Sequence, residues 1–321
     1  MNARAYPVSD AQQGSLRPAV RRQLEGQNQH IRVATVNIGT LTGKGREIAA
    51  MMKTRKLDIL CLQETRWTGG KSKGKARNLG DGCKLYYSGG VKPRNGVGIC
   101  LNEYWQDKVI DVVRKSDRLI TMKLVTSAKN YNIISAYAPQ QGCSEEEKNV
   151  FWNQLEDEIS RIPDTEQLML AGDLNGHIGQ ERTGYRRWHG GETVGQRNQE
   201  GERILEIARI HDLAIVNTFF HKKEEHLITF RSGKYHSVID YILVRREVMG
   251  KIRNCKVIPG ESIARQHRLM VMDMRERKSK EKKRKRKERI RWWKLTKSEG
   301  KEFVDKLAET IVEQWGRPGR I

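Results

Sequence analysis

The segment 168–180, Leu-Met-Leu-Ala-Gly-Asp-Leu-Asn-Gly-His-Ile-Gly-Gln, places a polar pair at the end of a buried strand. Residues 168–171 form a short apolar run typical of a core strand, and Gly172 ends it. Asp173 and Asn175 stand two residues apart, so in an extended segment their side chains point the same way. Such a pair could activate a water, face a metal or hold a phosphate. Gly-Asp-Xaa-Asn is equally good turn chemistry, so this stretch alone leaves both interpretations open.

Apolar runs of strand length that end in polar residues recur along the chain. We expect strands over residues 31–38, 57–62, 85–87, 96–101, 119–125, 131–136, 168–171, 213–216, 228–230, 238–244 and 269–272. Helical spacing predicts helices over residues 45–55, 144–162 and 202–210, and Ser144 with Glu147 forms a capping box at the start of the second. Residues 69–77 form a Gly/Lys-rich loop. Many strands with few helices predict an α/β fold in which sheets pack as a sandwich.

The charge of the chain points to a polyanionic partner. The net charge is +22; residues 277–321 contribute +10, which leaves +12 for the rest. Nucleic acid is the first expectation and an anionic membrane surface the second. We expect a disordered arm over residues 1–29, one domain over 30–276, and a basic tail with a short helix over 277–321. The tail sequence Lys-Lys-Arg-Lys-Arg-Lys predicts a nuclear location or a nucleic-acid-binding tail.

Cysteine usage and hydropathy constrain the compartment. The five cysteines form no CxxC pair and show no zinc spacing, which fits a reducing intracellular compartment. No apolar run approaches the ~20 residues of a membrane span, and no secretory signal is visible.

A set of polar residues stands at the ends of the expected strands: Asn37, Gln63-Glu64, Tyr137, Asp173 with Asn175, Asp240 and His267. Each alone has an ordinary structural explanation. Asp240 lies inside an apolar run, where an unpaired carboxylate is costly, and His267 would relieve it. Together and in this order, the set resembles the endonuclease/exonuclease/phosphatase superfamily of DNase-I-like nucleases and AP endonucleases. The resemblance covers residues 31–274 and implies a four-layer sandwich of two packed sheets flanked by helices.

Longer motifs narrow the resemblance. Cys-Leu-Gln-Glu-Thr-Arg-Trp, Ser-Ala-Tyr-Ala-Pro, Ala-Gly-Asp-Leu-Asn-Gly-His-Ile-Gly and Gln-His-Arg-Leu-Met-Val-Met-Asp are similar to the endonuclease domain of LINE-type retrotransposons of the RTE/BovB kind. Host proteins of the craniofacial development protein 2-like group carry such a domain. The resemblance implies a Mg²⁺-dependent DNA endonuclease (Mn²⁺ being a possible substitute) that leaves 3′-hydroxyl and 5′-phosphate ends.

The resemblance also implies roles for the polar set. Glu64 would be the metal ligand with Asn37 beside it, because a hard cation takes oxygen ligands. Asp173 would deprotonate or align the attacking water and Asn175 would hold the water or the phosphate. Tyr137 would donate to a phosphate oxygen or support the leaving group. His267, oriented by Asp240, would bind the scissile phosphate.

Charge predicts DNA as the partner. Lys71, Lys73 and Lys75, in the Gly/Lys-rich loop, and Arg231 are candidate contacts to nucleic acid. We expect no membrane partner and no small-molecule cofactor, and the oligomeric state is open.

Two departures from the family pattern leave alternatives open. Gln266 stands where many members have an aspartate before the histidine, which weakens any second-metal role; Gly39 stands where AP endonucleases carry an acid, which argues against full AP-site repair. A non-catalytic, domesticated nucleic-acid- or chromatin-binding protein is therefore an alternative. A phosphoinositide or lipid phosphatase is a third, since the basic tail would suit an anionic membrane too.

Overall fold

A computed structural model describes residues 29–68, 76–127, 129–276, 301 and 305–306. The chain divides into a unit ending at residue 279 and a second unit over residues 280–321. The expected N-terminal arm, nearly all of the tail, and Lys71, Lys73 and Lys75 lie outside the described residues. The boundaries expected for the arm, domain and tail therefore stay predictions.

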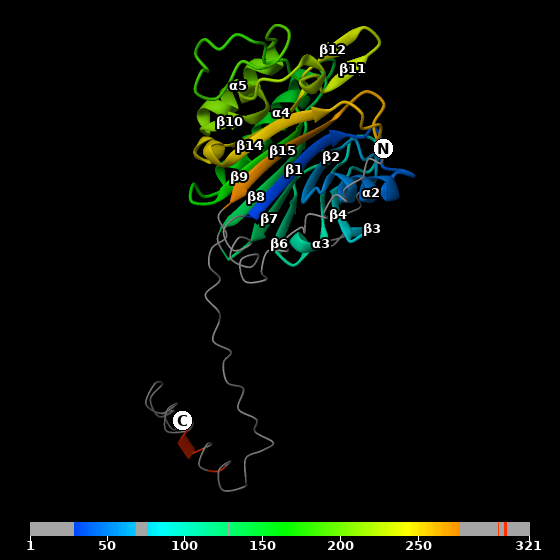
Figure 1. The fold of residues 1–321 in the computed structure, drawn as a ribbon, viewed down its shortest axis with the longest axis vertical. Coiled ribbons are helices and arrows are strands. Elements are labelled where there is room, and N and C mark those ends of the chain that lie inside the picture. Colours follow the sequence, from blue (N-terminus) through cyan, green and yellow to red (C-terminus); the bar gives the residue numbers. More distant parts are fainter. Residues whose placement is uncertain (1–28, 69–75, 128, 277–300, 302–304, 307–321) are drawn as a thin grey trace, which may run out of the picture. The chain divides into compact units, whose positions relative to one another are not determined.

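Two mixed sheets form the first unit (Figure 1). The seven-stranded sheet has the order β14 (Ile252–Ile258), β15 (Leu269–Glu276), β1 (Gln29–Asn37), β2 (Ile59–Gln63), β5 (Val97–Leu101), β4 (Cys83–Ser88), β3 (Ala76–Gly80). The six-stranded sheet has the order β10 (Leu213–Ile215), β13 (Asp240–Arg245), β9 (Gln167–Asp173), β8 (Asn130–Tyr137), β7 (Leu119–Val125), β6 (Val109–Arg114). A separate hairpin pairs β11 (Phe230–Ser232) with β12 (Tyr235–Ser237).

Three helices cover the outer faces of the sheets: α2 (Gly45–Arg55), α4 (Glu145–Ser160) and α5 (Gln199–Ile210). The described residues also form the short α3 (Glu103–Gln106) and the 3₁₀ helices η1 (Val216–Phe219), η2 (Glu224–His226) and η3 (Arg246–Lys251). The Ser144 hydroxyl accepts the backbone N–H of Glu147 at 3.2 Å, as a capping box requires. The Glu147 carboxylate binds Arg118 instead of reaching back to Ser144. Among the described helices, none is long and apolar enough to cross a membrane.

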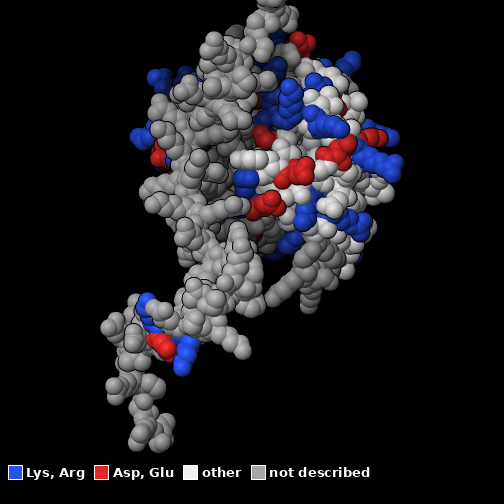
Figure 2. All heavy atoms as spheres, turned by 60° about the horizontal axis from the view of Figure 1, so that its bottom comes forward, with Lys and Arg blue, Asp and Glu red and all other residues white. Residues whose placement is uncertain are grey.

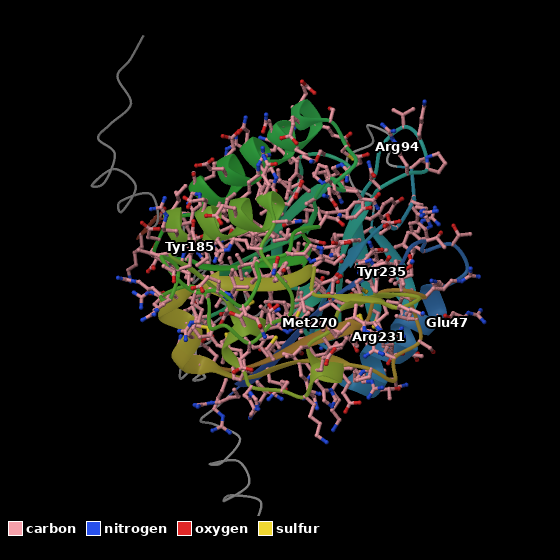
Figure 3. The ribbon with its side chains drawn as sticks, turned by 90° about the horizontal axis from the view of Figure 1, so that it is seen from above. Glu47, Arg94, Tyr185, Arg231, Tyr235 and Met270 are labelled. Atoms are coloured by element: carbon pink, nitrogen blue, oxygen red, sulfur yellow. The ribbon has the colours of Figure 1, made fainter. Side chains whose placement is uncertain are left out.

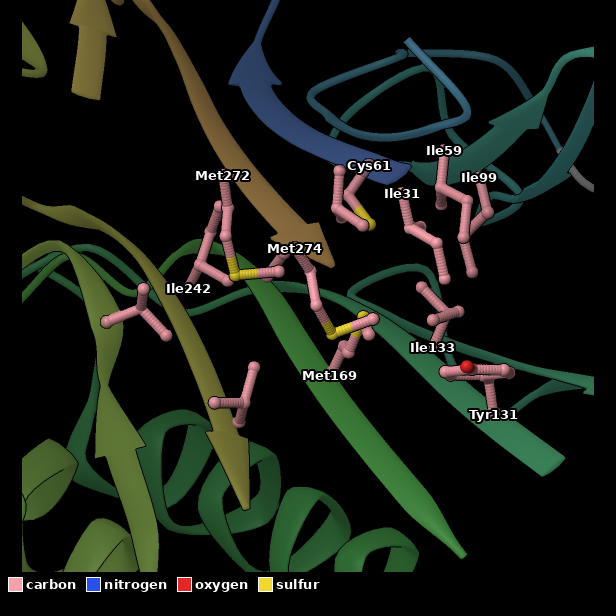
Figure 4. Packing of buried hydrophobic residues seen from close by; sticks show 14 of the residues in the cluster. Ile31, Ile59, Cys61, Ile99, Tyr131, Ile133, Met169, Ile242, Met272 and Met274 are labelled. Atoms are coloured by element: carbon pink, nitrogen blue, oxygen red, sulfur yellow. The ribbon is translucent and has the colours of Figure 1, made fainter. Parts of the chain in front are cut away.

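Three apolar clusters hold the layers together. Side chains from both sheets, among them Cys61, Ile133 and Met169, meet in the central cluster (Figure 4). A second cluster packs α4 and α5 on the six-stranded sheet, and a third packs α2 on the seven-stranded sheet. Burying one large aliphatic side chain contributes roughly 1.5–3 kcal/mol, so these clusters are the main source of stability. The four-layer sandwich expected from the sequence is confirmed.

Several elements differ from the expectation. Strands β6, β12 and β14 were not expected, and residues 76–77, expected in a loop, begin β3. Of the expected strand over 228–230, only Phe230 lies in a strand, where it begins the β11–β12 hairpin. Strands β3, β6 and β14 lie at sheet edges, and polar residues interrupt the apolar run of each.

Candidate active site

The topology brings the ends of six strands to one edge of the sandwich. Strands β1 and β2 are parallel, with Asn37 beside Gln63, and β8 and β9 are parallel, with Tyr137 beside Asp173. Antiparallel β13 starts opposite the end of β9, so Asp240 faces Asp173 directly. His267 lies just before β15, which pairs antiparallel with β1. Residues scattered from position 37 to 267 therefore converge.

Asn37 connects the two sheets. Its side chain is 1% exposed, and its NH₂ group donates to Glu64 Oε1 at 2.9 Å and to Asp173 Oδ2 at 3.0 Å. Its amide oxygen accepts the backbone N–H of Gly39 at 3.0 Å. Asn37 thus holds the two carboxylates by their oxygens, one from each sheet.

Glu64 follows β2 in a left-handed backbone conformation, with φ of 51°. Its Oε1 also accepts the Tyr137 hydroxyl at 2.9 Å, and its Oε2 accepts Arg66 Nη2 at 2.9 Å. Burial alone would raise the pKa of Glu64, but the hydrogen bonds from Asn37, Arg66 and Tyr137 outweigh it and lower that pKa. Glu64 is therefore an ionised carboxylate at neutral pH. A positive φ at a non-glycine residue is strained, and it directs this side chain into the site.

Asp173, Asp240 and His267 form a buried cluster. His267 Nδ1 lies 2.9 Å from Asp240 Oδ2, and Nε2 lies 3.6 Å from Asp173 Oδ2. Burial and the Asp240 charge raise the pKa of Asp173 to about 7, against the opposing pull of His267. Burial opposes protonation of His267, but Asp240 and Asp173 outweigh it and raise the His267 pKa to about 9. A base and a cationic donor therefore stand side by side near neutral pH.

Asn175 departs from the extended geometry expected of it. Strand β9 ends at Asp173, and Asn175 has φ of 48°, so the two-residue alternation of a strand does not apply there. Its NH₂ group donates to the Ala138 carbonyl at 2.8 Å, and its backbone N–H donates to Asp173 Oδ1 at 3.1 Å. The expectation that both side chains project together from a strand is wrong; a turn at Asn175 orients Asp173 instead.

Several supporting residues received no role from the sequence. Beneath the site, Gln63 Nε2 donates to Ser135 Oγ and Gln63 Oε1 accepts the Thr35 hydroxyl, each at 3.2 Å. These residues tie β1, β2 and β8 together across the two sheets. A Cβ atom added at Gly172 would lie 1.9 Å from the Ala136 carbonyl oxygen, so only glycine fits where β8 and β9 approach. In the sequence, the only sign of these supporting residues was that polar residues stand inside apolar runs.

A cationic cavity of about 330 Å³ opens beside Glu64 and Tyr137. Arg66, Arg94 and Arg118 line it, and the Arg118 guanidinium lies 5.0 Å from the centre of the Tyr137 ring. Of the nucleic-acid contacts expected from the sequence, only Arg231 is among the described residues; it lies half-buried in β11. Figure 3, seen from above, shows Arg94, Arg231 and Tyr235 on the same half of the molecule.

On the face that Figure 2 shows, acidic and basic side chains of the described residues are interspersed. Arg66, Arg94 and Arg118 line one cavity together with Glu64 and Glu147, and the excess of positive charge there suits a substrate with an anionic backbone.

The donor set suits a hard divalent cation. Glu64 offers an ionised, partly exposed carboxylate, whereas Asn37 turns its NH₂ group toward the carboxylates, which makes it an orienting residue with an oxygen held by Gly39. Asp173, Asp240 and His267 are a second group whose ligand atoms lie within 4.8 Å of one another. The second group is buried and its members pair with one another, whereas Glu64 lies beside a cavity, which favours Glu64 as the metal-holding residue.

Comparison with known proteins agrees with this geometry. A family model described as "Endonuclease/Exonuclease/phosphatase family" matches residues 34–253. Craniofacial development protein 2 of Bos taurus is 29% identical over 76% of this chain and 40% of the relative, and that of Tragulus javanicus is 28% identical over 76% of this chain and 42% of the relative. The chain thus spans about two fifths of the length of these curated relatives.

Solved structures share the fold. An AP endonuclease from Leishmania major matches with a TM-score of 0.60 at 15% identity. The match covers 77% of this chain and 88% of the chain of that endonuclease. The endonuclease domain of TRAS1, a telomere-specific non-LTR retrotransposon, has a TM-score of 0.56 at 16% identity and covers 77% of this chain and 98% of its own. Since the family model spans more than half of the sequence, the chain belongs to the endonuclease/exonuclease/phosphatase family.

Proposed function

We propose that this protein is a Mg²⁺-dependent DNA endonuclease of retrotransposon origin that nicks a strand to leave 3′-hydroxyl and 5′-phosphate ends. The observation that carries the proposal is Asn37, whose single amide orients Glu64 from one sheet and Asp173 from the other. That arrangement separates a metal-holding carboxylate from a second carboxylate with a raised pKa. Hydrolysis of a phosphodiester needs both functions.

The protein's own groups divide the work. Asp173, whose pKa lies near neutral pH, takes the proton of the attacking water. His267, kept protonated by Asp240, donates to a phosphate oxygen where negative charge develops. The Tyr137 hydroxyl donates a hydrogen bond to Glu64 and so holds that carboxylate in position. A divalent cation held by Glu64 would polarise the phosphoryl group.

Charge supports a nucleic-acid backbone as the substrate. Arg66, Arg94 and Arg118 surround the cavity next to Glu64, and each phosphate they neutralise adds salt-dependent affinity. The Lys/Arg-rich segment at 282–287 supports a nuclear location. Names of relatives such as the TRAS1 endonuclease domain support DNA as the target class.

Nicking of a supercoiled plasmid tests the proposal. Wild type, Asp173→Ala and the control Asp157→Ala, which changes an exposed carboxylate of α4, are each assayed with Mg²⁺ and with EDTA. The proposal predicts metal-dependent nicking by wild type and the control, and loss in Asp173→Ala. A folded wild-type protein that retards DNA in a gel but never nicks it would support the binding-protein alternative. Cleavage of inositol phosphates without DNA nicking would support the phosphatase alternative.

A further inference from the structure

The segment that carries His267 runs antiparallel to β11 and is joined to it by an isolated bridge. Arg231 N–H donates to the Gln266 carbonyl at 2.9 Å, and Arg268 N–H donates to the Thr229 carbonyl at 2.8 Å. These two bonds flank Phe230 and His267, which form an antiparallel bridge. In such a non-hydrogen-bonded pair, the opposed side chains stand close together on one face.

The Phe230 ring uses this register to hold the imidazole of His267. The two ring centroids are 5.0 Å apart and the planes meet at 64°, an edge contact that aromatic pairs favour. The nitrogens of the same imidazole face Asp240 at 2.9 Å and Asp173 at 3.6 Å. Two carboxylates therefore fix the imidazole at its nitrogens, and Phe230 restrains it from a third direction.

Thr229 holds the other member of the pair. Its hydroxyl oxygen is fully buried and accepts the backbone N–H groups of Ile239 and Asp240, both at 3.1 Å. Thr229 and Phe230 are adjacent in sequence, so one short segment contacts both Asp240 and His267.

The Gln266 side chain extends this arrangement outward. Its Nε2 donates to the Ser232 hydroxyl at 3.2 Å, and the residue is exposed. At this position, where the family pattern often has an acid, the amide ties the His267 segment to the hairpin.

We propose that Thr229 and Phe230 are positioning residues for the Asp240–His267 pair, and that the Gln266–Ser232 hydrogen bond braces them. This inference rests on the proposed function, because positioning matters where His267 serves a reaction. In this inference the side chain of Gln266 has a structural role, which is to hold the His267 segment against the hairpin.

The first experiment compares Phe230→Ala and the conservative Phe230→Tyr with Phe220→Ala. Phe220 is a matched control because it is a partly buried aromatic residue packed against the central cluster. A misplaced catalytic group lowers rate by up to about 10²-fold, so we expect kcat of Phe230→Ala to fall roughly 10- to 100-fold with KM within about twofold. Phe230→Tyr restores most of kcat, and Phe220→Ala leaves it near wild type. A rise in KM with kcat unchanged would assign Phe230 to substrate contact and overturn the inference.

Nuclear magnetic resonance of the imidazole gives a readout independent of activity. The Nδ1 proton that His267 gives to Asp240 should produce a sharp low-field signal in wild type and Phe220→Ala. The signal should broaden or vanish in Phe230→Ala and in Thr229→Val, which removes the shared acceptor while keeping the shape. An unchanged signal in folded Phe230→Ala protein contradicts the inference. If wild type fails to nick DNA, the proposed function fails while this signal still decides the positioning claim.

A double-mutant cycle tests the brace. An exposed neutral hydrogen bond is weak, so Gln266→Ala and Ser232→Ala should each lower kcat about two- to fivefold, and the double variant no further. Calorimetry should give the same Mg²⁺ stoichiometry and affinity for Gln266→Ala as for wild type. Additive losses, or a changed metal affinity, would show that Gln266 acts elsewhere.

Discussion

Replacing Asp173 by asparagine should abolish nicking and yet protect the folded state from the loss of stability that wild type shows as pH rises from about 4 to about 7. Folding raises the pKa of this carboxyl from its ordinary value of 3.8 to about 7, chiefly through burial and the facing Asp240. An acid whose pKa is raised on folding destabilises the folded state in its charged form, so stability is lost as pH rises from about 4 to about 7. The amide of the Asp173→Asn variant carries no charge and escapes this loss.

The magnitude follows from the pKa shift. Each pKa unit is worth about 1.4 kcal/mol, so the shift sets an upper limit of about 4 kcal/mol on the gain. Asparagine can accept only one of the two hydrogen bonds now donated by Asn37 and the Asn175 backbone, which costs about 1–3 kcal/mol at every pH. The cost of the lost hydrogen bond is the same at every pH, so it does not affect how the stability difference between variant and wild type changes with pH. The prediction therefore concerns the slope of that difference against pH.

Urea denaturation of wild type and Asp173→Asn, in EDTA at several pH values from 4 to 8, measures that slope. The free energy of unfolding of the variant relative to wild type should rise with pH, by up to about 1.4 kcal/mol per unit between pH 4 and 7. His267, whose pKa is raised on folding, contributes stability fully present below its ordinary pKa and lost as pH rises toward 9, so it does not reverse the trend in this window. A difference that is flat across this range would refute the assignment of a raised pKa to Asp173.

Three further predictions concern the site. The initial rate of nicking should rise with pH through about 7 as Asp173 ionises and fall through about 9 as His267 loses its proton, and a rate that is flat from pH 6 to 10 would contradict both assignments. Tyr137→Phe removes a hydrogen bond to the Glu64 carboxylate, and thermal unfolding should show a loss of about 1–3 kcal/mol with weaker nicking; an unchanged stability would argue against that bond. Arg94→Gln should reduce the slope of log affinity for DNA against log salt by about 0.9, measured by fluorescence anisotropy, whereas an unchanged slope would place Arg94 away from the phosphates.

The sequence predicts the core of this fold well because buried strands are continuous apolar runs. The runs at 57–62, 119–125 and 168–171 correspond to β2, β7 and β9 within a few residues. The edge strands β6 and β14 escaped because charged and exposed or half-buried residues interrupt the apolar run of each. An apolar pattern cannot distinguish such a strand from a loop.

The sequence predicted which residues form the site better than it predicted how they contact one another. Asn37, Glu64 and Asp173 each end or follow an apolar run, and the parallel register of the strands brings such ends together. The actual geometry of Asn175 depends on a left-handed turn, which the alternation of a strand does not describe. Thr229 accepts the backbone N–H of Asp240 only because of how the neighbouring strands are aligned. The sequence around a threonine beside a strand does not indicate which backbone groups its hydroxyl will contact.

Ligation of the nicked product tests the central claim most directly. A supercoiled plasmid is nicked by wild-type protein with Mg²⁺, purified, and treated with DNA ligase, which seals only a 3′-hydroxyl next to a 5′-phosphate. Our account predicts that nicking requires the metal and that ligase restores the closed circle. Absence of nicking by folded protein, or nicks that ligase cannot seal, would contradict it.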